Sequence, residues 1–369
     1  MPKEASTVLC AEPACATKEK IMEYLKLADI NVIAERPWDI EVHNNTFYKK
    51  VLTEGSLGLG EAYMDGWWDC MHLDQFIYQL FLSQVEKKVK RSLSAYWTYF
   101  KARMFNLQGK KRSKQVIDIH YQLGNDLYEA MLDPLMVYSC GYWDKATTLA
   151  EAQTDKFDLI CRKLGLQPGM KVLDIGCGWG GFVKYAAEKY GVTAVGITLS
   201  ENQAAHARKI CVHLPVEILI KDYRDLNESF DRIISIGMFE HVGNKNYRTF
   251  MQVAHRALKP GGLFLLHTIG RNTSISGTDP WIHKYIFPNG QLPSIARIGG
   301  AIEKLFVMED WHNFGSDYDK TLMAWFENFD RAWPTLKNKY GDRFYRMWKY
   351  YLLSCAGGFR AREMQLWQL

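Results

Sequence analysis

VLDIGCGWGG, residues 172–181, is the stretch from which the architecture of this chain follows. Its apolar residues predict a buried strand that leads into Asp174, and the sequence FVKYAAEKYG directly after it predicts a helix. Glycines at 176, 178, 180 and 181 predict a tight turn between the two. Because this turn leaves N–H groups free at the helix start, it favours a nucleotide-type ligand with an anionic or carboxylate group.

Strands and helices continue to alternate after this stretch. The predicted strands cover 192–198, 216–222, 231–237 and 262–270, and the predicted helices 180–190, 201–211 and 246–258. This βαβ alternation predicts an α/β fold with a mostly parallel, doubly wound sheet, whose strands bind ligands at their carboxyl ends.

The C-terminal part of the chain departs from this regular alternation. Residues 271–310 are predicted to be an insertion, in which the segment 279–290 forms a loop over the site. The remaining predictions are a strand over 309–315, a helix over 317–333 and a last strand over 363–369.

Polar residues that follow the predicted strands are the candidates for binding a nucleotide-type cofactor. The tip of the second strand lacks the acid that is expected to bind a ribose, so Thr198 and Gln203 are expected to supply those hydrogen bonds. Tyr223 and Arg224 follow the third strand and are expected beside an adenine ring.

Two further polar residues follow apolar strands at the same edge of the sheet. Glu240 comes after the fourth strand and His267 lies in the fifth, where an acid and a histidine could hold or act as a base. His241 and His312 are interpreted as structural rather than catalytic.

The eight cysteines are scattered and form no C-x-x-C pair, so neither a metal site nor a disulfide framework is indicated. Cys140 and Cys355 are candidate catalytic thiols, but no histidine spacing supports a covalent nucleophile. For Cys355 the alternative is a small buried core residue.

The N-terminal part is divided by composition into a flexible tail, 1–20, and a small, mainly helical domain, 21–85. Within it, the sequence EGSLGLGEAYMDGWWDC (54–70) is interpreted as a compact turn packed by Trp67 and Trp68. The segment 73–84 predicts a largely buried helix. No secretory signal and no apolar run of about 20 residues is visible, so a cytoplasmic location is expected.

A basic linker helix is predicted over 86–117. Ten Lys or Arg and no acid lie between Lys87 and Lys114, so that the rest of a chain with formal charge +5 carries −5. Apolar residues step by three or four along 85–107. Two interpretations remain open, a connector helix with a solvated basic face or a contact with an anionic lipid surface. No recognised nucleic-acid-binding module accompanies the charge.

Several longer motifs carry a resemblance to a known family. The glycine stretch is similar to the cofactor loop of class I S-adenosylmethionine methyltransferases. Together with HYQLGNDLY, YSCGYW, GMFEHVG, DPWIHKYIFPNG and EDWHNFGSDY, it resembles the bacterial cyclopropane-fatty-acyl-phospholipid synthases. The sequence EGSLGLGEAYMDGWW matches the N-terminal domain of their long form, so 21–85 is expected to be lipid-associated and 118–369 to be the methyltransferase domain.

The resemblance implies that a methylene carbon from S-adenosylmethionine is added across a cis double bond of a membrane phospholipid. It implies a bound bicarbonate ion as base, with ligands at Glu240, His267, Tyr318 and the backbones of Cys140 and Ile269. The implied cofactor contacts are Tyr138, Ser139, Asp174, Gly176, Gly178, Gly180, Thr198, Leu199, Gln203, Tyr223 and Arg224. The pair Tyr223–Arg224 departs from the Trp-acid pair of the mycolic acid enzymes.

The resemblance also implies a homodimer, peripheral on the inner face of the membrane. Two alternatives are a methyltransferase that acts on a small molecule or RNA, and a non-catalytic lipid-binding protein. The basic segment is compatible with RNA, whereas the aromatic-rich insertion and the presence of Asp174, Glu240 and His267 favour catalysis on lipid.

Overall fold

The computed structural model describes residues 13–85, 124–275 and 277–369. The predicted basic helix and the start of the motif HYQLGNDLY lie outside the described residues.

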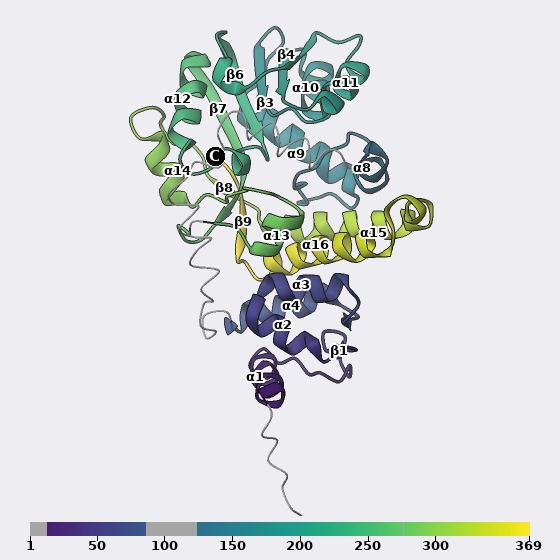
Figure 1. The fold of residues 1–369 in the computed structure, drawn as a ribbon. Helices are drawn as coiled ribbons and strands as arrows, with labels where there is room; N and C mark the ends of the chain where they lie inside the picture. Colours follow the sequence, from purple (N-terminus) through teal and green to yellow (C-terminus); the bar gives the residue numbers. More distant parts are fainter. Residues whose placement is uncertain (1–12, 86–123, 276) are drawn as a thin grey trace, which may run out of the picture.

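A seven-stranded sheet confirms the predicted doubly wound fold (Figure 1). The strands are β3 (Lys171–Ile175), β4 (Thr193–Thr198), β5 (Val216–Ile220), β6 (Phe230–Ile236), β7 (Leu258–Arg271), β8 (His312–Asn313) and β9 (Met364–Gln368). Their order is β5-β4-β3-β6-β7-β9-β8, and the first five are parallel. The last predicted strand, β9, is antiparallel to both β7 and β8, so it is paired on both sides.

Helices cover both faces of this sheet. One apolar cluster joins it to α9 (Leu149–Lys163), α10 (Gly181–Tyr190) and α11 (Glu201–Ile210). A second cluster joins the other face to α12 (Tyr247–Ala257) and α14 (Ile295–Ile302). Because the strands are buried on both faces, they read in the sequence as nearly continuous apolar runs.

The N-terminal region consists of α1 (Pro13–Leu27), β1 (Ile40–Val42), α2 (Thr46–Glu54), α3 (Ser56–Met64), β2 (Trp68–Cys70) and α4 (Leu73–Leu82). The predicted compact turn over 54–70 is therefore wrong, because most of it forms α3 and β2. Gly58 and Gly60 sit inside α3, where a Cβ would meet the Lys50 carbonyl at 2.5 Å and the Trp281 ring at 2.4 Å. These glycines allow close packing of a helix instead of forming a turn.

Two long helices, α15 (Ser316–Tyr340) and α16 (Asp342–Arg360), lie between the N-terminal helices and the sheet (Figure 1). The predicted helix over 317–333 continues through Pro334. An aromatic contact with α16 holds this continuation: Tyr340 stacks on Phe344 with 4.7 Å between ring centroids. One apolar core is shared by the N-terminal helices and by α15, α16, α8 (Asn125–Met131) and α13 (Pro280–Tyr285).

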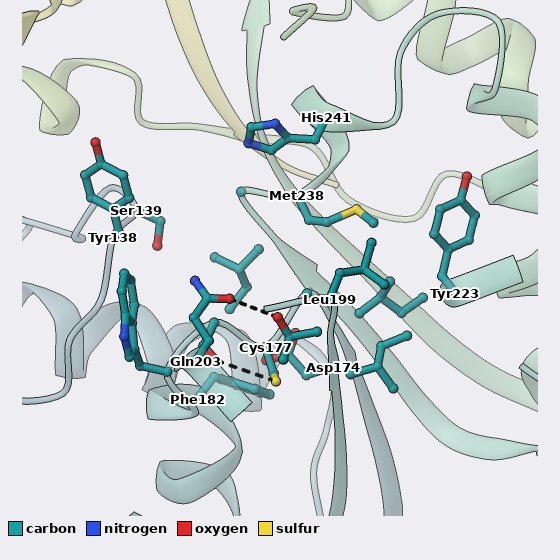
Figure 2. A pocket seen from close by; sticks show the side chains of 18 of the residues that line it. Tyr138, Ser139, Asp174, Cys177, Phe182, Leu199, Gln203, Tyr223, Met238 and His241 are labelled. Atoms are coloured by element: carbon teal, nitrogen blue, oxygen red, sulfur yellow. Dashed lines mark hydrogen bonds between the residues drawn. The ribbon is translucent and has the colours of Figure 1, made fainter. Parts of the chain in front are cut away.

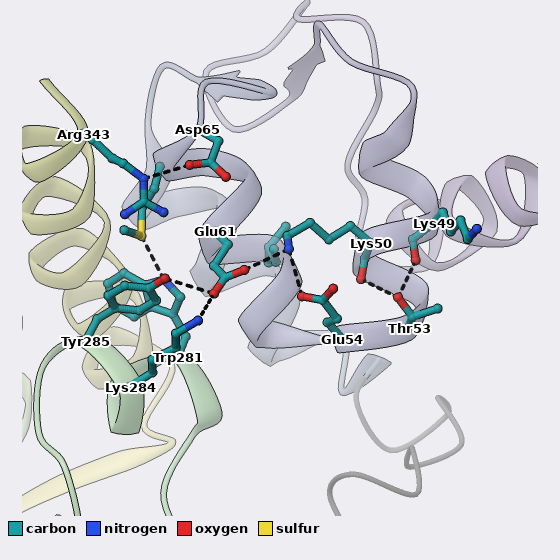
Figure 3. Close-up of polar contacts among 12 residues, drawn as sticks. Lys49, Lys50, Thr53, Glu54, Glu61, Asp65, Trp281, Lys284, Tyr285 and Arg343 are labelled. Carbon is teal, nitrogen blue, oxygen red and sulfur yellow. Dashed lines mark hydrogen bonds and ion pairs between the residues drawn. The ribbon is translucent and has the colours of Figure 1, made fainter.

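Polar contacts join α3 to α13 and α16 (Figure 3). The Glu61 carboxylate accepts hydrogen bonds from Lys284 at 2.5 Å and Tyr285 at 3.0 Å, and pairs with Lys50 at 2.8 Å. Burial alone would raise the pKa of Glu61, but the bonds from Lys284 and Lys50 lower it to about 2. The N-terminal region is thus fixed to the segment that was predicted to lie over the site.

We expect Gly60→Ala to lower the free energy of unfolding by about 1–3 kcal/mol, because the new methyl group would overlap the buried Trp281 ring. Gly300→Ala is the matched control: it is an exposed helical position where a Cβ meets nothing within 4 Å. Urea unfolding monitored by circular dichroism measures both. A Gly60→Ala protein as stable as the Gly300→Ala protein would contradict the packing described for α3.

Candidate functional site

A pocket opens at the carboxyl ends of β3, β4, β5 and β6 (Figure 2). Its lining contains all but one of the residues that the sequence suggested for cofactor binding: Tyr138, Ser139, Asp174, Gly176, Gly178, Thr198, Leu199, Gln203, Tyr223 and Arg224. Gly180 does not line it. A Cβ on Gly180 would lie 2.8 Å from the Ala207 side chain, so this glycine lets α10 pack against α11.

The glycine turn and Asp174 form the floor of the pocket. Gly176 has φ +92°, and a Cβ there would lie 2.8 Å from the Met238 side chain. Asp174 is 2% exposed, and among the described residues its Oδ1 atom has no hydrogen-bond partner. Burial raises the pKa of Asp174 to about 7, against the opposing effect of the Lys156 charge. A cationic group in the pocket would satisfy this carboxylate.

Thr198 and Gln203 are joined to each other at the end of β4. The Thr198 hydroxyl donates to the amide oxygen of Gln203 at 2.9 Å, which leaves the Gln203 amide nitrogen as the donor available to a ligand. In Figure 2, Gln203 points into the pocket between Ser139 and Leu199.

The end of β5 supplies Tyr223 and Arg224. The Arg224 guanidinium donates to both oxygens of Asp222, each at 2.7 Å, so it orients this carboxylate. Tyr223 is 7% exposed and packs edge-on against Phe250, with 5.1 Å between ring centroids. Tyr223 lies across the pocket from Tyr138 and Ser139 (Figure 2).

A second group of polar residues lies at the ends of β6 and β7. Glu240 belongs to the short helix η2 (Phe239–His241), and its Oε1 accepts a 2.6 Å hydrogen bond from the Ile269 amide. Glu240 Oε2 is buried and has no partner within the described part of the chain. Burial raises the pKa of Glu240 to about 7, although the Ile269 amide opposes this rise. The Ile269 N–H is therefore engaged by Glu240.

His267 is fully buried in β7. Its Nδ1 lies 3.4 Å from the Gln368 amide nitrogen, and in the described residues its Nε2 has no partner. Burial, with the charges of Lys156 and Lys163, holds the pKa of His267 well below its usual range. His267 is thus neutral, and one ring nitrogen is unpartnered.

Tyr318 lies near both Cys140 and Glu240. The Tyr318 ring packs on Phe359 at 4.5 Å between centroids. Burial raises the pKa of Tyr318 well above its usual value, and the nearby Cys140, Tyr138 and Glu240 add to the rise. Cys140 is fully buried and its thiol donates to the Gly141 carbonyl at 3.1 Å.

Burial raises the pKa of both candidate thiols, well above the usual value for Cys140 and to about 12 for Cys355. Both are therefore protonated and are poor nucleophiles at neutral pH. No group of three or more His, Cys, Asp or Glu suited to a metal ion occurs among the described residues.

Several lining residues were missed or given no role from the sequence. His241 lines the pocket, as do Phe287, Pro288 and Asn289 of the segment predicted to lie over the site. Burial lowers the pKa of His241 to about 4, so it is neutral.

The buried Lys156 on α9 was also missed, because α9 itself was not predicted. Its signal is a lysine on the apolar stripe formed by Leu149, Ala152 and Ile160.

Comparison with known proteins gives these findings a context. Residues 108–369 match the family model for mycolic acid cyclopropane synthetase. The chain is 55% identical, over 94% of its length and 91% of the relative, to the cyclopropane-fatty-acyl-phospholipid synthase of Escherichia coli strain K12. It also resembles the crystal structure of mycolic acid cyclopropane synthase CmaA1 complexed with SAH and CTAB, with TM-score 0.65 and 34% identity over 69% of this chain and 96% of that one.

A more distant structure, coclaurine N-methyltransferase, shares the fold with TM-score 0.70 at 21% identity, covering 84% of this chain and 97% of that one. The sheet order, the pocket and these matches agree: the chain belongs to the cyclopropane-fatty-acyl-phospholipid and mycolic acid cyclopropane synthase family.

Proposed function

We propose that this protein is an S-adenosylmethionine-dependent cyclopropane-fatty-acyl-phospholipid synthase, which adds a methylene group across the double bond of unsaturated phospholipid acyl chains. The observation that carries the proposal is a cofactor-type pocket next to two buried atoms that have no partner in the described residues, Glu240 Oε2 and His267 Nε2. The identity of 55% with the Escherichia coli synthase supports it.

In this proposal, the pocket binds S-adenosylmethionine along its length. The unpartnered Asp174 oxygen would accept from the amino group of the methionine part, and the glycine turn lets the ligand approach the backbone. Thr198, Leu199 and Gln203 would contact the ribose, and Tyr223 with Arg224 would lie beside the adenine. Tyr138 and Ser139 would contact the methionine end.

The reaction requires a site without water. The π electrons of the double bond attack the sulfonium methyl carbon, the carbon–sulfur bond breaks, and the chain is left with a carbocation. Loss of a proton from the added methyl group lets that carbon close the ring. Aromatic faces can stabilise the cation. Aromatic rings gather around Tyr318, which lies near Glu240: Tyr318 packs on Phe359 at 4.5 Å, and Tyr138 packs on Trp325 at 5.1 Å.

The residues present fit a bicarbonate ion as the base. Glu240 Oε2 and His267 Nε2 are buried without partners among the described residues, and Tyr318 lies beside Glu240. A carboxyl group whose pKa is raised to about 7 can keep a proton and donate it to an anion. When bound, the ion would supply the group that accepts the proton. The Ile269 amide would hold Glu240 in place. The backbone of Cys140 would be a ligand of the ion.

The domain assignment is part of the proposal. We assign 21–85 as a lipid-associated N-terminal domain, 86–117 as a basic linker helix and 118–369 as the methyltransferase domain of a homodimer. Among the described residues, no helix combines the length and apolarity needed to cross a bilayer. A peripheral contact with anionic lipid on the inner membrane face is consistent with the ten basic residues between 87 and 114.

The experiment that tests the function incubates the purified protein with methyl-labelled S-adenosylmethionine and unsaturated phospholipid vesicles. Label should appear in lipid that has gained one CH2 group, and saturated phospholipid vesicles should stay unlabelled. Cofactor binding without any labelled lipid product would contradict the proposal.

We expect Glu240→Gln to lower turnover by about 10²- to 10⁴-fold, since it disturbs the group that receives the proton. The affinity for the cofactor should change little, because Glu240 does not line the pocket. Glu217→Gln, at an exposed position of β5, is the control. Full activity of the Glu240→Gln enzyme on vesicles would reject the assignment.

Removing dissolved CO2 should slow the wild-type enzyme, and added bicarbonate should restore its activity.

We expect Cys355→Ser to keep appreciable turnover, because a thiol with its pKa raised to about 12 takes no part as a nucleophile. Cys140→Ser should lose activity by disturbing the buried contacts of its thiol. Mass spectrometry of the enzyme stopped during turnover provides the check. A methylated cysteine that passes its methyl group to lipid would overturn this expectation.

We expect the triple change of Lys110, Lys111 and Arg112 to Glu to weaken binding to anionic vesicles, most clearly at low salt. Each basic residue near an anionic surface contributes roughly 1 kcal/mol, and this effect decays within a Debye length. Sedimentation with vesicles measures it, with zwitterionic vesicles for comparison. Unchanged sedimentation would show that this segment makes no such contact.

A further inference from the structure

Lys156 is a buried charged residue to which the proposed reaction assigns no role. It is fully buried in α9, and its ammonium donates hydrogen bonds to the Ser139 hydroxyl at 2.8 Å and to the Gln153 amide oxygen at 2.7 Å. Within the described part of the chain, no carboxylate lies within ion-pair distance of it. The amide nitrogen of Gln153 donates in turn to the Ser139 carbonyl at 2.8 Å. Residue 139 is therefore held at both its side chain and its backbone.

A buried ammonium without an ion pair is unfavourable for folding. Burial lowers the pKa of Lys156 to about 7, although Asp133, Cys140 and Asp174 oppose this effect. Two uncharged groups also face it, the neutral His267 and the ring of Phe157, which lies 4.7 Å away. An apolar side chain of similar length would avoid the unfavourable burial, so the lysine has a use other than stability.

The contacts of Ser139 indicate that use. Its oxygen accepts from Lys156, so the Ser139 proton points away from the ammonium, and Ser139 itself lines the pocket (Figure 2). The Oδ1 atom of Asp174, which has no partner among the described residues, suits the amino group of the methionine part of the cofactor. The carboxylate of the methionine part then needs hydrogen-bond donors close by. A hydroxyl that accepts a hydrogen bond from a cation is a stronger donor to an anion.

We propose that Lys156 is a positioning residue that acts through Ser139, directing the serine hydroxyl at the carboxylate of bound S-adenosylmethionine. This inference rests on the proposed function, because it takes that cofactor as the ligand. It extends the proposal by assigning recognition of the carboxylate to a pair of residues, one of which does not touch the ligand.

The test measures binding of S-adenosylhomocysteine by calorimetry, which needs no activity on lipid. Lys156→Met should raise Kd by about ten-fold or more, while the midpoint of thermal unfolding stays the same or rises. Ser139→Ala should weaken binding in the same direction. The Kd of the double variant should not exceed the higher Kd of the two single variants, because both changes remove the same interaction. Lys209→Met, on the exposed face of α11, is the control.

Two further readouts separate positioning from a merely structural role. Lys156→Gln keeps an uncharged donor and should recover part of the affinity. The ratio of Kd between Lys156→Met and wild type should be largest below pH 7, where Lys156 is protonated, and should shrink above it. Asp174 ionises in the same range and the Lys156 charge lowers its pKa, so the same ratio is also measured in the Ser139→Ala background, where any pH dependence that persists belongs to Asp174.

An unchanged Kd in Lys156→Met would overturn the inference, as would a loss of affinity accompanied by a lower thermal midpoint in both Lys156 variants. Tight, Lys156-dependent binding without lipid product would leave this inference standing and reject the proposed lipid reaction instead.

Discussion

The hydrogen bond from the Ile269 amide to Glu240 Oε1 is the contact on which the candidate site depends. It ties the short helix after β6 to the neighbouring strand β7 and uses one oxygen of a fully buried carboxyl group. The second oxygen is left without a partner among the described residues, near a neutral His267 whose Nε2 is also unpartnered. Burying two such atoms is unfavourable unless a bound group satisfies them. The proposed site for a bound anion rests on these two atoms.

The remaining architecture keeps that site dry. Helices α15 and α16 and the N-terminal helices share one apolar core that includes Cys140 and Tyr318. The Glu61 contacts and the packing of Trp281 on Gly60 hold α13 against α3, and the chain then runs from α13 directly to Phe287 in the pocket lining. Helix α13 thus connects the N-terminal region to the cofactor pocket. A carbocation in the acyl chain would be lost to water if this cover were open.

The sequence predicted the parts of the structure that depend on local pattern. The sheet, the glycine turn and the pocket residues Thr198, Gln203, Tyr223 and Arg224 follow from apolar runs and from the residues after them. Helix α16 was not predicted; its Gly357 allows it to pack against the backbone of α4 near Asp74. Gly60 in α3 was interpreted as part of a turn, whereas it allows this helix to pack against Trp281. The contacts of Lys156 and of Glu240 could not be predicted, because they depend on which residues of neighbouring elements meet.

The central claim is that the transferred methyl carbon loses a proton to a base in the site before the ring closes. The most direct measurement uses S-adenosylmethionine with a fully deuterated methyl group and a phospholipid with one unsaturated acyl chain. Mass spectrometry of the product lipid then counts the deuterium atoms that remain. Our interpretation predicts that two of the three are retained, in a ring methylene group. Retention of all three, as in simple methyl transfer, would contradict it.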